Sequence, residues 1–195
     1  MCDMPVGTAE VDLLRRSRAG DTSAFDGLIT LHREKIYMQA YMIVRNEEDA
    51  LDLCQETFVK AWRSLHRFDG KFPLAAWLRR IVTNAAIDLC RSRGRWKQSP
   101  IDEGPILPEA GSRTTPSGFE RPGDGLVREE LRDRLRKALD SLSPEHRAAI
   151  SLKEIEGLSY KEIAAQMGCT TGTVMSRLFY ARHKLQAALA DLRND

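Results

Sequence analysis

The chain has 195 residues, enough for one medium-sized domain or two small ones. Hydrophobic residues make up 42% and charged residues 30%, which is typical of a folded protein and excludes a disordered one. The longest nearly apolar run, residues 36–44, is too short to span a bilayer, and the amino terminus lacks the pattern of a signal peptide. The formal net charge of +2 indicates no class of partner. We therefore expect a cytoplasmic protein without membrane insertion.

The residues that carry most enzyme and metal chemistry are scattered. The four cysteines, at positions 2, 54, 90 and 169, include no CxxC pair, and no histidine lies at ligand spacing from them. This pattern predicts neither a zinc site nor a disulfide framework. A Ser/His/Asp set, a Gly-rich phosphate loop and an acidic metal cluster are also missing from the sequence. We expect no metal, no cofactor and no enzymatic activity.

The amino-terminal half has the apolar spacing of helices. Apolar side chains recur at intervals of three and four, which places them on one helix face. No stretch alternates apolar and polar residues as a half-buried strand does. The sequence therefore predicts an all-α fold. The two expected core stripes are Leu51, Cys54, Phe58, Ala61 and Leu65, and then Leu78, Ile81, Ala85 and Leu89.

Residues 46–56 form an acidic segment with five carboxylates and no Lys or Arg. Acids are favoured in the first turn of a helix, which explains some of them. Asp52 and Glu56 lie four residues apart, however, so like charges share one face at a small cost in stability. This cost indicates a docking surface for a basic protein partner. A solvated face is the alternative.

Residues 71–97 have the opposite character, with seven basic residues and one acidic residue, a local net charge of +6. On a helix with the second stripe in the core, Trp77, Arg80, Asn84 and Arg91 share another face. An aromatic plane, guanidinium groups and an amide are the groups that bind unstacked single-stranded bases. Burial of Trp77 in the core is the alternative.

The segment before this basic helix is a short loop over residues 68–73, with the sequence FDGKFP. Gly and Pro favour a turn there, and two aromatic rings flank it. Such a loop is able to hold a base extruded from a duplex.

The composition changes between residues 98 and 125, which hold five of the eight prolines and five of the 13 glycines. Apolar residues in this stretch follow no period. We predict a flexible linker over residues 96–126. It separates an amino-terminal helical domain, residues 8–95, from a carboxy-terminal one, residues 127–195.

The sequence of the carboxy-terminal half predicts four further helical segments. An apolar stripe (Leu131, Leu135, Ala138 or Leu139, Leu142) precedes a helix start at Ser143-Pro144. Ser159 and Glu162 have the spacing of a capping box at the start of a short helix over residues 160–167. Gly168 ends this helix, and Thr170 or Thr171 caps a longer one. In the longer helix we expect Val174, Leu178, Ala181, Leu185 and Ala188 or Leu189 to face inward.

A short helix, a glycine turn and a longer helix form the helix-turn-helix layout, in which the second helix enters the major groove of DNA. Residues 163–190 carry three fixed positive charges and no acid, which suits contacts to phosphates. A plain three-helix bundle with a solvated face is the alternative. The outward residues of the second helix are Thr171, Thr173, Met175, Ser176, Arg177, Phe179, Tyr180, Arg182 and Lys184.

Three segments in this order resemble the bacterial extracytoplasmic-function (ECF) sigma factors, which are initiation subunits of RNA polymerase. They are DALDLCQETF (residues 49–58) with the Ala-Trp pair at 61–62, WLRRIVTN (residues 77–84) with Asp88 and Arg91, and GLSYKEIA (residues 157–164) running to GTVMSRL (residues 172–178) with the Ala-Arg pair at 181–182. The resemblance covers about residues 10–95 and 127–193. It implies an alternative sigma factor that binds core polymerase and directs it to specific promoters.

The family's residue roles follow by position, as implications of the resemblance. The surface for the clamp coiled coil of the largest polymerase subunit is Asp49, Asp52, Gln55 and Glu56. The residues that melt the minus-ten element and bind it as single-stranded DNA are Phe68, Asp69, Gly70, Lys71, Trp77, Arg80, Asn84 and Arg91. The residues that read the minus-thirty-five element as duplex are Thr171, Thr173, Met175, Ser176, Arg177, Phe179, Tyr180 and Arg182.

The resemblance also implies an inhibitory anti-sigma factor, a role in stress response and a linker that threads through the polymerase toward the RNA exit path. Many relatives carry a basic residue in place of Met175, and often in place of Tyr180, so the promoter read by this chain differs from theirs. A free-standing helix-turn-helix regulator with an amino-terminal sensing or dimerisation domain is the alternative function. It needs a pocket or an apolar self-association stripe, where this sequence has an acidic face and a basic face.

Overall fold

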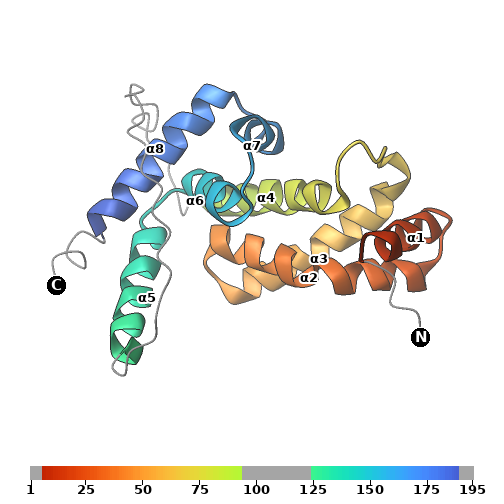
Figure 1. Ribbon diagram of the computed structural model, residues 1–195, viewed down its shortest axis with the longest axis horizontal. Helices are drawn as coiled ribbons and strands as arrows, with labels where there is room; N and C mark the ends of the chain where they lie inside the picture. Colours follow the sequence, from red (N-terminus) through yellow and green to blue (C-terminus); the bar gives the residue numbers. More distant parts are fainter. Residues whose placement is uncertain (1–5, 94–123, 189–195) are drawn as a thin grey trace. The chain divides into compact units, whose positions relative to one another are not determined.

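The structure is a computed structural model that describes residues 6–93 and 124–188, and Figure 1 shows these residues as helices connected by turns. The two described ranges contain no β-strand, so the all-α prediction is confirmed. The chain divides into two compact units, Met1–Arg95 (unit 1) and Trp96–Asp195 (unit 2). Most of the predicted linker lies outside the described residues. Among the described helices, none is long and apolar enough to cross a membrane.

Unit 1 is a bundle of four α-helices: α1 (Val6–Arg18), α2 (Thr22–Val44), α3 (Glu47–Ser64) and α4 (Leu74–Ser92). A short 3-10 turn, η1 (Leu65–Arg67), follows α3. The long helix α2 packs against all three others, and α3 packs against α4. Fully buried aliphatic side chains fill the space between these helices. The largest of them are Leu28, Ile36, Ile43 and Leu78.

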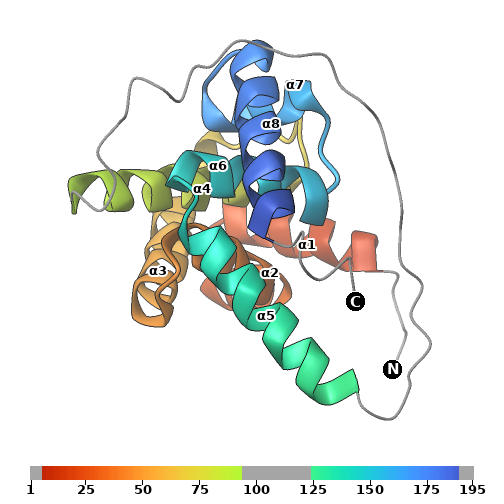
Figure 2. The same ribbon diagram turned by 90° about the vertical axis from the view of Figure 1, so that its left-hand side faces the viewer.

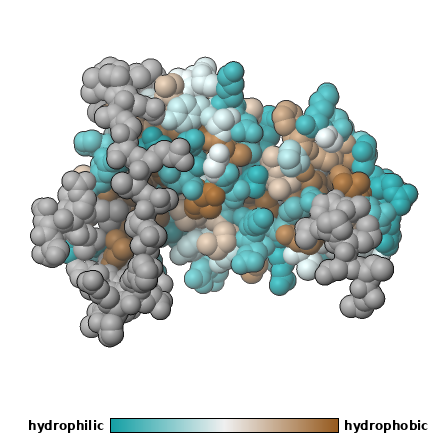
Figure 3. All heavy atoms as spheres, in the orientation of Figure 1, coloured by the Kyte–Doolittle hydropathy of each residue, from teal (hydrophilic) through white to brown (hydrophobic). Residues whose placement is uncertain are grey.

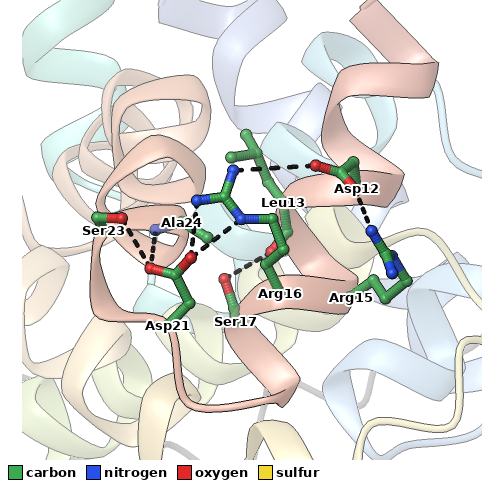
Figure 4. A network of polar contacts seen from close by, with 8 residues as sticks. All are labelled: Asp12, Leu13, Arg15, Arg16, Ser17, Asp21, Ser23 and Ala24. Atoms are coloured by element: carbon green, nitrogen blue, oxygen red, sulfur yellow. Dashed lines mark hydrogen bonds and ion pairs between the residues drawn. The ribbon is translucent and has the colours of Figure 1, made fainter.

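A polar network joins α1 to the start of α2 (Figure 4). One carboxylate oxygen of Asp21 accepts hydrogen bonds from the backbone N–H of Ala24 at 3.1 Å and the hydroxyl of Ser23 at 2.7 Å. The other oxygen accepts two from the Arg16 guanidinium, at 3.0 and 2.7 Å. The Ser23 hydroxyl and Arg16 hold the pKa of Asp21 well below its ordinary range. Asp21 therefore caps α2 and fixes the end of α1 in the same contact.

The predicted core stripes of unit 1 are partly wrong. Leu51 is exposed on α3, and of the stripe predicted for α4 only Leu78 is buried. The buried face of α4, which packs against both α2 and α3, lies about one residue further along the helix than the predicted stripe: Val82, Ala86 and Cys90 are buried in place of Ile81, Ala85 and Leu89. It even includes Thr83, whose hydroxyl accepts a hydrogen bond from the buried Gln39 amide at 3.2 Å. The buried residues of α4 are Leu74, Leu78, Val82, Thr83, Ala86, Ile87 and Cys90.

Unit 2 contains α5 (Asp124–Asp140), α6 (Pro144–Ile150), a π-helical turn η3 (Ser151–Ile155), α7 (Tyr160–Met167) and α8 (Thr171–Ala188). The helix α8 packs against α5, α6 and α7. Figures 1 and 2 show α7 and α8 joined by a tight turn, with α6 beside them. In α8 the predicted inward residues Val174, Leu178 and Ala181 are buried, whereas Ala188 is exposed.

The helix α5 is less buried than the sequence predicts. Ala138 and Leu139 in its last turn and Leu142 just after it are in the core, but Leu131 and Leu135 are exposed. The apolar stripe is therefore inward only at its carboxy-terminal end. The helix begins at Asp124, inside the last residues assigned to the linker.

The predicted ends of the helix-turn-helix segment are confirmed. Ser143 caps α6 by accepting a hydrogen bond from the backbone N–H of His146 at 3.2 Å. Ser159 and Glu162 form the capping box of α7, with each side chain bonded to the other residue's backbone N–H. Gly168 ends α7 with a φ of 63°, in the left-handed region. The hydroxyl of Thr170 then accepts from the backbone N–H of Thr173 at 3.1 Å and starts α8.

Candidate polymerase and nucleic-acid interfaces

The exposed face of α3 combines acids with apolar side chains. Asp52, Gln55 and Glu56 are exposed as predicted, and Glu56 pairs with Lys60 one turn later at 2.8 Å. Leu51 and Val59 are exposed on the same side of the helix. Hydrophobicity alone does not place a residue inside, since much of any protein surface is apolar. Leu51, predicted to lie in the core, and Val59 are therefore surface residues of this face, which apolar periodicity did not indicate.

Asp49 has a different environment from the other three predicted polymerase contacts. Its side chain is buried, with 6% of the residue exposed, and it forms a short ion pair with Arg93 at the end of α4. The hydrogen bond that the Arg93 guanidinium donates to the Asp49 carboxylate is the largest cause of the raised pKa of Arg93. Asp49 therefore belongs to the contact between α3 and α4, and its prediction as part of an exposed docking surface is wrong in that respect.

Four of the residues predicted to bind single-stranded DNA share one side of α4. Arg80, Asn84 and Arg91 are exposed, and Trp77 lies half-buried on the same side of the helix. The Trp77 ring packs on the Phe68 ring, with centroids 5.1 Å apart and planes inclined by 37°. Trp77 is thus neither a core residue nor fully exposed. Phe68 holds one part of its ring while the rest remains accessible.

The loop before α4 is a turn around Gly70, whose φ is 72°. The carboxylate of Asp69 accepts a hydrogen bond from the backbone N–H of Lys71 at 3.1 Å and pairs with the Lys71 ammonium at 3.0 Å. The hydrogen bond from the backbone N–H of Lys71 is the largest cause of the lowered pKa of Asp69. Asp69, Gly70 and Lys71 are all exposed, as a contact surface requires.

The two aromatic rings of this loop have opposite environments. Phe68 is 5% exposed and supports Trp77, so it is not available to an extruded base as predicted. Phe72 is 68% exposed. In the sequence, one Phe lies on each side of the Asp-Gly-Lys turn. Nothing in this pattern indicates which of the two rings faces solvent.

The outward residues of α8 fall into two groups. Thr171, Met175, Phe179 and Tyr180 are exposed. Thr173, Ser176 and Arg177 are half-buried and contact the helix or the preceding turn. The Ser176 hydroxyl donates to the Thr173 carbonyl at 3.0 Å, and an Arg177 N–H donates to the Cys169 sulfur at 3.7 Å.

Two predicted duplex contacts, the exposed Tyr180 and the half-buried Arg182, also have partners within unit 2. The Tyr180 ring stacks on the buried His146 ring of α6, at 4.7 Å between centroids and 25° between planes. Arg182 donates to the Glu154 carboxylate at 3.3 and 3.0 Å. The sequence offered no sign of the His146 contact, because the two residues are far apart in the chain.

Within the described ranges, no group of three or more His, Cys, Asp or Glu residues could hold a metal ion. Among the described residues, Cys54, Cys90 and Cys169 form no disulfide, and the first two are buried. Burial raises the pKa of the Cys54 thiol. In the view of Figure 3, hydrophobic surface residues lie among hydrophilic ones.

Comparison with known proteins identifies the two units. Residues 28–95 match the family model for Sigma-70 region 2, and residues 132–185 match the model for Sigma-70 region 4. The chain is 40% identical over 192 residues to the ECF RNA polymerase sigma factor SigE of Mycolicibacterium smegmatis, covering 96% of this chain and 69% of that protein. It is 35% identical over 184 residues to the RNA polymerase sigma-H factor of Pseudomonas aeruginosa, covering 92% and 93%.

Two solved structures have the same fold. One is the sigma factor RpoE in complex with the anti-sigma factor NepR from Bartonella quintana, with a TM-score of 0.61, 29% identity and coverage of 85% of this chain and 96% of that one. The other is CnrH in complex with the cytosolic domain of CnrY, with a TM-score of 0.63, 31% identity and coverage of 94% and 98%. The chain therefore belongs to the ECF sigma factors and directs RNA polymerase to promoters.

Proposed function

We propose that this sigma factor divides promoter recognition between its two units. Unit 1 melts the minus-ten element and binds it as single-stranded DNA through α4 and the preceding loop, and unit 2 reads the minus-thirty-five element as duplex through α8. The observation that carries the proposal is the exposed face of α4, on which Trp77, Arg80, Asn84 and Arg91 lie together. The division into functional domains at residues 8–95 and 127–195, with a linker over residues 96–126, is part of the proposal.

The face of α4 has the groups that an unpaired strand needs. Trp77 offers a stacking plane that Phe68 holds in place, and Phe72 in the loop offers a second one. The Asn84 amide can bond a base edge, and Arg80 and Arg91 can neutralise phosphates. Stacking on aromatic rings combined with a basic groove is the usual way in which proteins bind single strands.

The exposed face of α3 is the proposed contact with core polymerase. Its carboxylates at Asp52 and Glu56 suit a basic partner surface, and Leu51 and Val59 add apolar area that water leaves when the partner binds. Gln55 lies between them and can bond across the interface. Asp49 acts indirectly, by holding α3 against α4.

The relatives support a further regulatory partner. RpoE and CnrH were solved with an anti-sigma factor and with the cytosolic domain of CnrY, respectively. We extend this to the present chain as a proposal: an anti-sigma protein inhibits it by covering surfaces needed by polymerase or promoter. In the same proposal the chain acts in the cytoplasm and has no catalytic activity of its own.

The test compares promoter opening on two templates, one fully paired and one mismatched across the start region. With Asn84→Ala or Trp77→Ala, open complex on the paired template should fall about tenfold. The mismatched template needs no melting and should partly restore run-off transcript. Arg177→Ala lies on the duplex-reading helix, so its defect should persist on both templates.

Lys35→Ala, on the exposed side of α2, is the matched control and should open both templates normally. Circular dichroism must first show that each variant is folded, because Trp77 also packs on Phe68. If folded Trp77 and Asn84 variants open the paired promoter as well as wild type, α4 does not bind the unpaired strand. Permanganate footprinting measures the opening directly.

A further inference from the structure

On the side of α8 that points away from the core of unit 2, two neighbouring exposed side chains are apolar. Val174, Leu178 and Ala181 are buried on the inner side of the helix. Met175 and Phe179, one turn apart on the other side, are 37% and 45% exposed. The Phe179 ring packs beside the His183 ring, with centroids 6.3 Å apart. Met175 and Phe179 thus form an exposed pair, which we call the apolar ridge of α8.

The fixed cations of α8 do not lie on this ridge. Arg182 is held by the Glu154 carboxylate. Lys184 donates to the Ser141 carbonyl at 2.6 Å, with its ammonium 5.6 Å from the centre of the Tyr180 ring. Arg177 lies against the Cys169 sulfur in the turn. A bidentate arginine, the commonest reader of guanine, is therefore not presented by the ridge.

Base edges in the major groove differ in what they offer to an apolar side chain. Guanine, adenine and cytosine present only hydrogen-bonding groups there, whereas thymine also presents a methyl group. A Met or Phe side chain pressed against a hydrogen-bonding edge removes water from it without replacing the bonds, which is unfavourable. Against a thymine methyl the same side chain buries apolar surface on both partners.

On the basis of the proposed duplex reading by α8, we infer that Met175 and Phe179 are specificity-determining residues that recognise thymine methyl groups in the minus-thirty-five element. Four residues of helix rise about 6 Å, and successive bases of one strand are about 3.4 Å apart. The ridge therefore covers thymines within about two base-pair steps of each other.

The first part of the test identifies the element. Holoenzyme made from core polymerase and the full chain selects from promoters with a randomised minus-thirty-five region and a constant minus-ten region. Wild type should enrich A·T pairs at two nearby positions. Met175→Ala and Phe179→Ala should each lose the preference at one of them. Met175→Leu, which keeps an apolar side chain, should retain it, and Gln186→Ala, exposed further along α8, should leave the selected sequence unchanged.

The second part removes the methyl groups alone. The selected promoter is made with deoxyuridine in place of thymidine, one position at a time, and holoenzyme binding is measured. Loss of a contacted methyl should weaken wild-type binding about fourfold. Phe179→Ala or Met175→Ala should bind the thymidine and deoxyuridine forms equally at the position that the missing side chain contacted.

The outcomes distinguish failure of the thymine contacts from failure of the proposed duplex reading by α8. If wild type selects a defined element but binds deoxyuridine and thymidine promoters equally at every position, thymine reading is wrong while duplex reading by α8 stands. If wild type selects no minus-thirty-five sequence, the proposed duplex reading itself fails. If Ala at the ridge leaves the selected element intact but weakens binding of an anti-sigma protein, the ridge is a protein-binding surface and the inference is overturned.

Discussion

The Asp49 carboxylate and the Arg93 guanidinium form an ion pair between the first turn of α3 and the carboxy-terminal cap of α4. Asp49 is buried, and the backbone N–H of the same residue donates to the Asn46 side chain that caps α3. The acidic helix proposed to contact polymerase and the basic helix proposed to hold the unpaired strand are therefore linked at one point. A shift at either end of this pair changes the relative placement of the two surfaces.

This link predicts a difference between two neighbouring acids. Asp49→Ala should lower the free energy of unfolding of unit 1 by about 1–3 kcal/mol, because it removes a buried hydrogen-bonding group. Asp52→Ala, which removes an exposed carboxylate, should change it by less than about 0.5 kcal/mol. Urea unfolding followed by the fluorescence of Trp62 and Trp77, both in unit 1, measures the difference. Equal effects of the two substitutions would contradict a structural role for Asp49.

Charge reversal on α3 should weaken polymerase binding. The double variant Asp52→Lys with Glu56→Lys replaces attraction to a basic partner by repulsion at several contacts, although single exposed ion pairs contribute little. Both side chains are exposed, so the variant should remain folded. Pull-down of core polymerase measures the loss. The same charge change on α2, Asp26→Lys with Glu34→Lys, is the control, and equal binding by both double variants would show that α3 is not the docking helix.

Two glycines of the helix-turn-helix should respond oppositely to alanine. Gly168 has a φ of 63°, where a Cβ is unfavourable by about 1–2 kcal/mol, so Gly168→Ala should destabilise unit 2. Gly172 lies inside α8, and a Cβ there would meet only the Thr170 hydroxyl at an ordinary 3.7 Å. Gly172→Ala should therefore stabilise by up to about 1 kcal/mol. Thermal unfolding followed by circular dichroism compares them, and a neutral Gly168→Ala would contradict the left-handed turn.

The Asp21 network predicts an acid dependence of unit 1. The folded-state pKa of Asp21 is depressed, so its contribution to stability is fully present above the unfolded value of about 3.8 and is lost as the pH falls below it. Asp21→Asn keeps a capping side chain but removes the charge. The variant should lose less stability than wild type between about pH 5 and pH 2 in urea unfolding. Parallel curves for the two proteins would show that Asp21 is not the titrating group.

Local signals in the sequence were sufficient to predict where helices end. They were insufficient to predict which side chains are exposed on many of the helices. Ser159, Glu162 and Gly168 act on residues within four positions, so their roles could be predicted and are found. The partner of Asp49, Arg93, is 44 residues away in the sequence, so no local pattern predicts the contact.

The same distinction explains the errors in the candidate sites. Whether Phe68 or Phe72 faces solvent depends on where Trp77 lies, and Trp77 is held by the packing of α4 between two other helices. Leu51 is apolar yet exposed because the buried face of α3 consists of other residues, among them Leu53, Cys54 and Phe58. The periodicity of apolar residues locates the buried face of a helix only to within about one residue. A shift of one residue changes which side chains are exposed, and therefore which of them can belong to a site.

The intramolecular partners of Arg177, Arg182 and Lys184 have a consequence for counterion release. A cation that already faces a carboxylate, a carbonyl or a sulfur displaces fewer condensed ions from DNA than a cation that faces only water. The logarithm of a DNA-binding constant falls with the logarithm of salt concentration in proportion to the number of phosphates neutralised. Duplex binding through α8 should therefore vary less with ionic strength than three fully hydrated cations would predict, because each of these side chains has a partner within unit 2.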